Sequence, residues 1–81
     1  MQRIYSKDFQ KHYQKLDSTI KERVWNALQK LPEGQYIKLK GNHTPPIYRI
    51  RVGKYRILFE MTEHIIRIID VDSRGDIYKQ I

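Results

Sequence analysis

Hydrophobic and polar residues alternate with two different periods along the chain, and the first of these periods is helical. Phe9, Tyr13 and Leu16 are separated by four and three residues, so they fall on one face of a helix. Ser6 precedes them and can accept a hydrogen bond from a backbone N–H that the first helical turn leaves unpaired. The pattern therefore predicts a helix near residues 7–16.

A second apolar stripe follows after almost no loop. It runs at helical spacing between Ile20 and Leu31, and Pro32 and Gly34 then end it. Residues 17–19, just before the stripe, supply several side-chain oxygens that can cap a helix. Two helices with so short a connection indicate a helical hairpin.

From residue 36 onward the period of alternation is two, which is typical of β-strands. We expect strands at residues 36–40, 48–52, 55–61 and 65–71. A polar, proline-containing loop separates the first two, and Gly53 with Lys54 forms a two-residue connection suited to a type II′ hairpin turn. The strands should therefore form an antiparallel meander, and residues 2–5 are also compatible with a short strand.

The last two long strands carry apolar residues on both faces, as strands in the middle of a fold do. We predict an α+β fold in which the N-terminal helical hairpin packs on a four-stranded, mainly antiparallel, twisted sheet. The helices should cover one face of this sheet and leave the other partly open and basic. A chain of 81 residues builds one core, so residues 1–81 are predicted to form a single domain.

The positive charge is concentrated in one stretch of the chain. The net charge is +7, and no carboxylate occurs between Glu33 and Glu60. Six basic residues fall in that interval: Lys38, Lys40, Arg49, Arg51, Lys54 and Arg56. Such a field attracts polyanions, so we expect a nucleic acid or an acidic protein as partner. A membrane is not expected as a partner, because these charges fall on strand-like sequence and no apolar run is long enough for a signal peptide or a membrane span.

Several kinds of chemistry lack the residues that they need. With no cysteine, the chain fits the reducing cytoplasm and cannot form a thiolate metal site. His12, His43 and His64 have no metal-ligand spacing and are interpreted as surface or edge residues, although His43 is close enough in sequence to the basic strands to contact a substrate. No glycine-rich phosphate loop or acyl-transfer serine motif is present. We expect no metal and no small-molecule cofactor, which leaves metal-free phosphoryl chemistry open.

Arginines of the basic stretch are predicted to converge. Side chains alternate across a strand, so Arg49 and Arg51 point away from the apolar set that meets the helices, and Arg56 lies just across the tight turn. Guanidinium groups match phosphate oxygens bidentately. Single arginines on an exposed strand face often serve only to prevent aggregation. Three together, without a carboxylate in the same stretch, favour a phosphate-binding surface.

The segment after the last strand adds further candidates. Arg74 and Tyr78 lie just past the strand end, where a rigid element positions side chains that stay accessible. Ile77 and Ile81 are interpreted as anchors that hold this segment to the core. Three nearby carboxylates are interpreted as ion-pair partners of basic residues: Asp70, Asp72 and Asp76.

These motifs, in this order, resemble the RelE/ParE superfamily of type II toxin–antitoxin systems. The resemblance rests on two helices followed by residues 37–41 (IKLKG), 48–59 (YRIRVGKYRILF) and 73–78 (SRGDIY), and it spans essentially the whole chain. A RelE-like toxin would be a ribosome-dependent endoribonuclease that cuts mRNA in the A site without a metal. The RNA 2′-hydroxyl would attack the adjacent phosphate. The implied partners are a RelB-like antitoxin, mRNA and the ribosome.

The resemblance also implies roles for residues. The implied catalytic residues are Arg56, Arg74 and Tyr78. The expected RNA-binding residues are Lys38, Lys40, Arg49, Arg51 and Lys54. Arg49 and Arg51 stand where RelE has lysines, and Ser73 stands where the family often has histidine or lysine. Because a guanidinium is a poor general base, these departures leave the proton acceptor unidentified.

Two other functions stay open on the same residues. ParE-like members share the fold and the basic strand but act on DNA gyrase, and a missing base suits them. The chain could also be a non-catalytic basic module that binds RNA or an acidic antitoxin. An RNase needs Arg56, Arg74 and Tyr78 on one surface, whereas a gyrase inhibitor does not.

Overall fold

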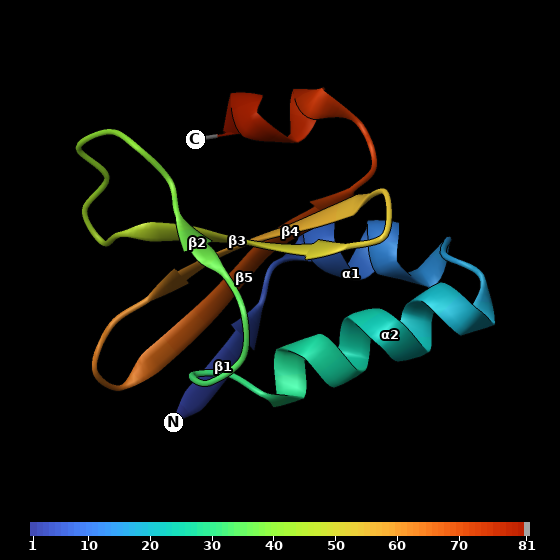
Figure 1. Cartoon of the computed structure of the whole chain (residues 1–81), viewed down its shortest axis with the longest axis horizontal. Coiled ribbons are helices and arrows are strands. Elements are labelled where there is room, and N and C mark those ends of the chain that lie inside the picture. Colours follow the sequence, from blue (N-terminus) through green and yellow to red (C-terminus); the bar gives the residue numbers. More distant parts are fainter. Residues whose placement is uncertain (81) are drawn as a thin grey trace.

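The computed structural model describes residues 1–80, which form two helices, five strands and a C-terminal 3-10 helix (Figure 1). In chain order the elements are β1 (Gln2–Tyr5), α1 (Lys7–Gln14), α2 (Ser18–Gln29), β2 (Ile37–Lys38), β3 (Ile47–Val52), β4 (Tyr55–Met61), β5 (Ile65–Asp72) and η1 (Gly75–Gln80). The predicted anchor Ile81 and the predicted ion pair of Asp76 lie outside the part of the chain whose side chains are described.

Both predicted helices are present, and each begins at a side-chain cap. Ser6 Oγ accepts a hydrogen bond of 3.0 Å from the backbone N–H of Phe9, as predicted. The Asp17 carboxylate does the same for the N–H of Ile20 at 2.9 Å. α1 ends before the predicted residue 16 because its last turn tightens, with the Lys15 N–H donating to the carbonyl three residues back.

The sheet has five strands in the order β1-β5-β4-β3-β2, so the predicted count of four is wrong. β1 lies parallel to β5, with Gln2 opposite Ile65, and the other neighbouring strands are antiparallel. The fifth strand forms because it pairs backbone groups that the edge of β5 would otherwise leave open. The N–H of Gln2 donates to the His64 carbonyl at 2.9 Å, and the N–H of Ser6 donates to the Ile68 carbonyl at 3.0 Å.

The connections beside β3 also differ in part from prediction. β2 is shorter than the predicted 36–40, because the loop that follows contains Pro45 and Pro46, which have no N–H to continue a ladder. Gly53 has a φ of 58° in the tight turn. No non-glycine residue among residues 1–80 has a positive φ, so Lys54 has a negative one, and this combination fits the predicted type II′ turn.

One face of the sheet packs against both helices, and η1 lies over the other face (Figure 1). The main core consists of Phe9, Val24, Leu28, Leu31, Ile50, Val52, Ile57, Phe59, Ile66, Ile68 and Val71. On the opposite face Ile47 and Leu58 are also buried, and Ile77 of η1 is only 1% exposed. Ile77 is thus the predicted anchor, and it closes part of the basic face. None of the helices within residues 1–80 is long and apolar enough to cross a membrane.

Candidate functional site

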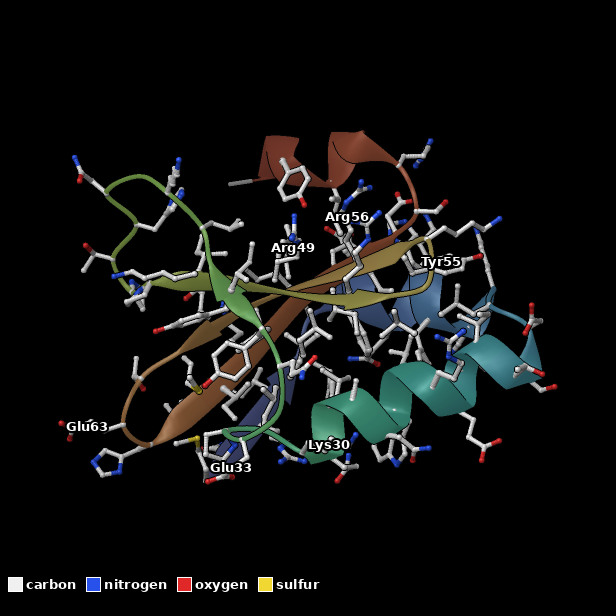
Figure 2. The ribbon with its side chains drawn as sticks, viewed as in Figure 1. Lys30, Glu33, Arg49, Tyr55, Arg56 and Glu63 are labelled. Atoms are coloured by element: carbon white, nitrogen blue, oxygen red, sulfur yellow. The ribbon has the colours of Figure 1, made fainter. Side chains whose placement is uncertain are left out.

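Three predicted arginines lie on one face of β3 and β4. The strand register places Arg51 directly opposite Arg56, and Arg49 is on the same face because it is two residues from Arg51. Figure 2 shows Arg49 and Arg56 on the side of the sheet toward η1. Like charges directly opposite each other destabilise a sheet, so an anion bound between Arg51 and Arg56 would relieve their repulsion.

Tyr78 of η1 joins two of these arginines. Nη1 of Arg49 donates a hydrogen bond of 3.1 Å to the Tyr78 hydroxyl. The guanidinium carbon of Arg56 lies 5.9 Å from the centroid of the Tyr78 ring, within the range of a cation–π contact. Nη1 of Arg56 also donates to the Ser73 carbonyl at 3.4 Å. The structure thus brings Arg49, Arg56 and Tyr78 together, and we call these three residues the arginine–tyrosine cluster.

The buried position of the Arg49 side chain costs the fold stability. Its Nε atom is buried and has no hydrogen-bond partner among the groups that the structure describes. A buried donor without a partner costs about 1–3 kcal/mol, and more when it belongs to a charged group. Unsatisfied groups of this kind are rare in folded proteins and call for an explanation. The cost is understandable if Arg49 serves binding rather than stability.

Arg74 lies in the turn after β5, where it pairs with Asp72 as predicted. Its Nη2 and Nε donate to Oδ2 of Asp72 at 3.1 and 3.3 Å, and its backbone N–H donates to Oδ1 at 3.1 Å. Burial by itself raises the pKa of Asp72, but these hydrogen bonds and the charge of Arg74 outweigh it, so the pKa lies below the ordinary 3.8. The Arg74 side chain is 71% exposed.

The predicted lysines lie outside the arginine–tyrosine cluster. Lys38 is opposite Tyr48 in the register. Its side chain therefore leaves the strand on the helix-covered face of the sheet, and not on the face that carries Arg49. Lys40 is exposed in the loop after β2. Lys54 occupies the tight turn, with its amino group 5.7 Å from the ring centroid of Tyr55. Positive charge therefore also occurs outside the basic face, at β2, in the loop after it and in the tight turn.

One pair of polar residues was not predicted. Nδ1 of His12 in α1 lies 2.6 Å from Oδ1 of Asp70 in β5, and the Asp70 side chain is fully buried. The sequence places these residues far apart, and only the prediction that Asp70 pairs with a basic group pointed toward the contact. Among the side chains that the structure describes, no three histidine or carboxylate groups lie close enough together to hold a metal ion.

Comparisons with known proteins agree with this fold. A chain of the RelB–RelE antitoxin–toxin complex from Methanococcus jannaschii is 27% identical, with a TM-score of 0.75 over 96% of this chain and 98% of that chain. A chain of the archaeal RelE–RelB complex from Pyrococcus horikoshii is 25% identical, with a TM-score of 0.74 over 91% and 94% of the two chains. The YoeB dimer from Staphylococcus aureus shares the fold at 21% identity, with a TM-score of 0.71 over 86% and 92%.

A search of curated protein sequences gives no significant match. The model of a protein family, described as ParE toxin of the type II toxin–antitoxin system parDE, matches residues 3–78. The match spans both helices, all of the basic strands and the closing segment with Arg74 and Tyr78. The chain therefore belongs to the ParE toxin family of type II toxin–antitoxin systems, and its predicted place in the RelE/ParE superfamily is confirmed.

Proposed function

We propose that this toxin inhibits translation as a ribosome-dependent endoribonuclease, which cuts mRNA in the A site without a metal ion. The arginine–tyrosine cluster is the observation that carries the proposal. Arg49 and Arg56 present planar donors on one face, and Tyr78 holds both in place. Preorganised donors of this kind recognise phosphate groups and stabilise charge that develops on them.

In the proposed reaction the RNA 2′-oxygen attacks the adjacent phosphorus as the bond to the 5′-oxygen breaks. The products are a 2′,3′-cyclic phosphate and a 5′-hydroxyl. Negative charge builds on the phosphoryl oxygens, and Arg56, which contacts the Tyr78 ring and the Ser73 carbonyl, would stabilise it. Arg74 would assist by exchanging its contact with Asp72 for a phosphate oxygen. Tyr78 would stack on the exposed base, as aromatic residues do in many RNA-binding sites.

Basic residues outside the arginine–tyrosine cluster would hold the neighbouring phosphates. Arg51 and Lys54 are exposed on the same hairpin as Arg49 and Arg56, and Lys38 and Lys40 add positive charge in β2 and in the loop after it. Such contacts are largely independent of sequence, so they strengthen binding to any polyanion and weaken as salt concentration rises. This arrangement suits a toxin that selects its target by position on the ribosome.

The partner that we propose for the resting state is a RelB-like antitoxin. The structural neighbours from M. jannaschii and P. horikoshii are complexes of RelE with RelB, which supports this choice. An antitoxin with acidic residues would neutralise the basic face and keep RNA away from it. The proposed site of action is the cytoplasm, where the ribosome and mRNA are found.

A second candidate is inhibition of DNA gyrase. The observation that favours it is the match of residues 3–78 to the model of the ParE toxin family, because ParE-like toxins act on gyrase. Arg49 and Arg51, which stand where RelE has lysines, also suit a chain that needs no base. A protein that only binds RNA or an antitoxin would need the same basic surface but no catalytic residues.

One experiment separates these functions. Purified ribosomes programmed with a defined mRNA are incubated with the toxin, and the 5′ ends of the message are mapped by primer extension. We expect cuts at the codon in the A site, and none with the Arg56→Ala variant. Intact message together with altered supercoiling of plasmid DNA by purified gyrase would establish the second candidate instead.

A further inference from the structure

A buried carboxylate in β5 fixes the orientation of a histidine in α1. Asp70 is fully buried, and its Oδ1 lies 2.6 Å from Nδ1 of His12. The same oxygen accepts a hydrogen bond of 2.7 Å from the backbone N–H of Val71, so the carboxylate cannot easily swing away. The His12 side chain is 31% exposed. One side of the imidazole is therefore anchored inside the fold while the other reaches the surface.

A β-bulge makes this contact possible. The register between β4 and β5 shifts at Leu58 and Phe59, which leaves Ile69 as an extra residue on β5. Bulges re-aim the side chains next to them. Asp70 follows the extra residue. Its register partner Leu58 points to the face opposite the helices, yet the Asp70 side chain contacts His12 of α1. The Ser6 hydroxyl, which caps α1, also donates to the Ile69 carbonyl and holds the helix at the bulge.

The exposed side of the imidazole faces a cleft. This cleft has a volume of about 320 Å³ and lies between the end of α1 and the turn after β5. The charged and titratable groups that line it with His12 are Lys15, Tyr55, Asp72 and Arg74. Ser73 also lines it, and the carbonyl of Ser73 accepts the hydrogen bond of Arg56. The cleft therefore adjoins the arginine–tyrosine cluster, and two cationic side chains, Lys15 and Arg74, line it.

A His–Asp contact has an ordinary explanation, which is that the imidazole only satisfies the buried carboxylate. Two features go beyond it. The carboxylate at Nδ1 favours a proton on that nitrogen, so in the neutral form of the imidazole the lone pair is on Nε2. In addition, this ring lines a cleft with Arg74, one of the arginines expected to act on phosphate. A carboxylate behind an imidazole also stabilises the imidazolium that forms when Nε2 accepts a proton.

We propose that the cleft binds an RNA phosphate through Lys15 and Arg74, and that His12 is the general base of the cleavage reaction. Nε2 takes the proton of the 2′-hydroxyl as the bond from the 2′-oxygen to phosphorus forms and the bond to the 5′-oxygen breaks. The departing 5′-oxygen takes a proton from water, and the resulting hydroxide takes the proton of the imidazolium. Asp70 is a positioning residue, because it acts only through His12. This inference rests on the proposed RNase function.

The test uses the full chain on purified ribosomes with a single mapped codon in the A site. Single-turnover cutting rates are measured between about pH 6 and pH 8, the range in which imidazole side chains titrate. The variant is His12→Gln, and the matched control is His64→Gln, whose histidine side chain is 86% exposed in the turn between β4 and β5. A third variant, His12→Ala, is assayed with and without free imidazole.

General-base catalysis contributes about 10²–10⁴-fold. We expect the wild-type rate to rise with pH, and we expect His12→Gln to cut at least about 100-fold more slowly and to lack this rise. His64→Gln should cut like the wild type, and imidazole should restore part of the activity of His12→Ala. Asp70→Asn should reduce the rate and move the midpoint of the pH profile.

The possible failures are distinguishable. If the wild type leaves the message intact, the proposed RNase function fails, and this inference fails with it. If the wild type cuts and His12→Gln cuts equally fast, only the role of His12 is overturned. If His12→Gln is slow but keeps the wild-type pH profile, and imidazole does not restore His12→Ala, the histidine is structural and the inference is likewise overturned.

Discussion

Arg49 donates a hydrogen bond of 3.1 Å to the hydroxyl of Tyr78, and this contact ties β3 to η1 across the basic face of the sheet. The same tyrosine ring lies 5.9 Å from the guanidinium carbon of Arg56 on the adjacent strand. Ile77, the residue before it, is buried. Packing of Ile77 therefore positions Tyr78, and Tyr78 in turn positions two arginines.

Replacing Tyr78 with phenylalanine separates its two contacts. The ring stays available to Arg56, but the hydroxyl that accepts the hydrogen bond of Arg49 is lost. Hydrogen bonds to charged groups contribute about 1.5–3 kcal/mol, so we expect Tyr78→Phe to reduce the rate of mRNA cutting by about tenfold or more. The measurement is the single-turnover rate on programmed ribosomes. Tyr36→Phe is the control, because its hydroxyl donates to the Pro32 carbonyl. An equal loss in both variants would contradict a specific role for Tyr78.

Arg56 should not be replaceable by lysine. Lysine keeps the positive charge but lacks the planar set of donors that matches phosphate oxygens. Removing one preorganised donor from a site that stabilises developing charge costs about 10²–10³-fold in rate, so we expect Arg56→Lys to cut at least about 100-fold more slowly. The measurement is the same single-turnover rate, with folding checked by thermal melting.

The control for Arg56→Lys is Arg67→Lys, since Arg67 is an exposed arginine of β5 that pairs with Glu60. This variant should cut at the wild-type rate. If Arg56→Lys also retained full activity, the site would need only positive charge at this position, and the planar donors of Arg56 would have no catalytic role.

The alternation of apolar and polar residues predicted those features of the fold and of the site that depend on residues close together in the sequence. The strict period of two around Arg49 and Arg51 fixes their face, and the two-residue turn fixes where Arg56 lies. The Ser6 cap and the Asp72–Arg74 pair are also short-range in sequence, and both were predicted. Each of these features follows from geometry within a few residues.

Features that depend on distant pairing were not predictable in the same way. β1 pairs with β5 across most of the chain, and a short strand carries no signal of its partner. The contact between His12 and Asp70 depends on a bulge at Ile69, which the alternation of apolar residues does not reveal. The face of Lys38 follows from the register of β2 on β3. Register is a property of the assembled sheet.

Arg49 is expected to serve binding at the expense of stability. Its buried Nε has no hydrogen-bond partner among the described residues, so an apolar side chain of similar length removes that cost. We predict that Arg49→Met unfolds at the same or a higher urea concentration than the wild type, while RNA cutting falls by about tenfold or more. Urea unfolding followed by circular dichroism checks the first part. A clear loss of stability would show that Arg49 is structural.

The Asp72–Arg74 pair gives the fold a pH dependence of definite sign. The pKa of Asp72 lies below 3.8, because hydrogen bonds from Arg74 outweigh the opposing effect of burial. A carboxyl group with a lowered pKa binds fewer protons in the folded than in the unfolded state. The pair therefore stabilises the fold above about pH 4, and this stabilisation disappears as the pH falls through the folded-state pKa.

Asp72→Asn tests this dependence directly. Arg74 is well exposed to solvent, so the pair contributes at most about 1 kcal/mol. We expect the variant to be less stable than the wild type by about that amount at pH 7, and the difference to shrink as the pH falls through the folded-state pKa of Asp72, as measured by urea unfolding across the acidic range. Glu63→Gln is the control, because Glu63 is 93% exposed and should give no pH-dependent difference. A difference between wild type and Asp72→Asn that stayed constant with pH would show that the pair does not lower the pKa of Asp72.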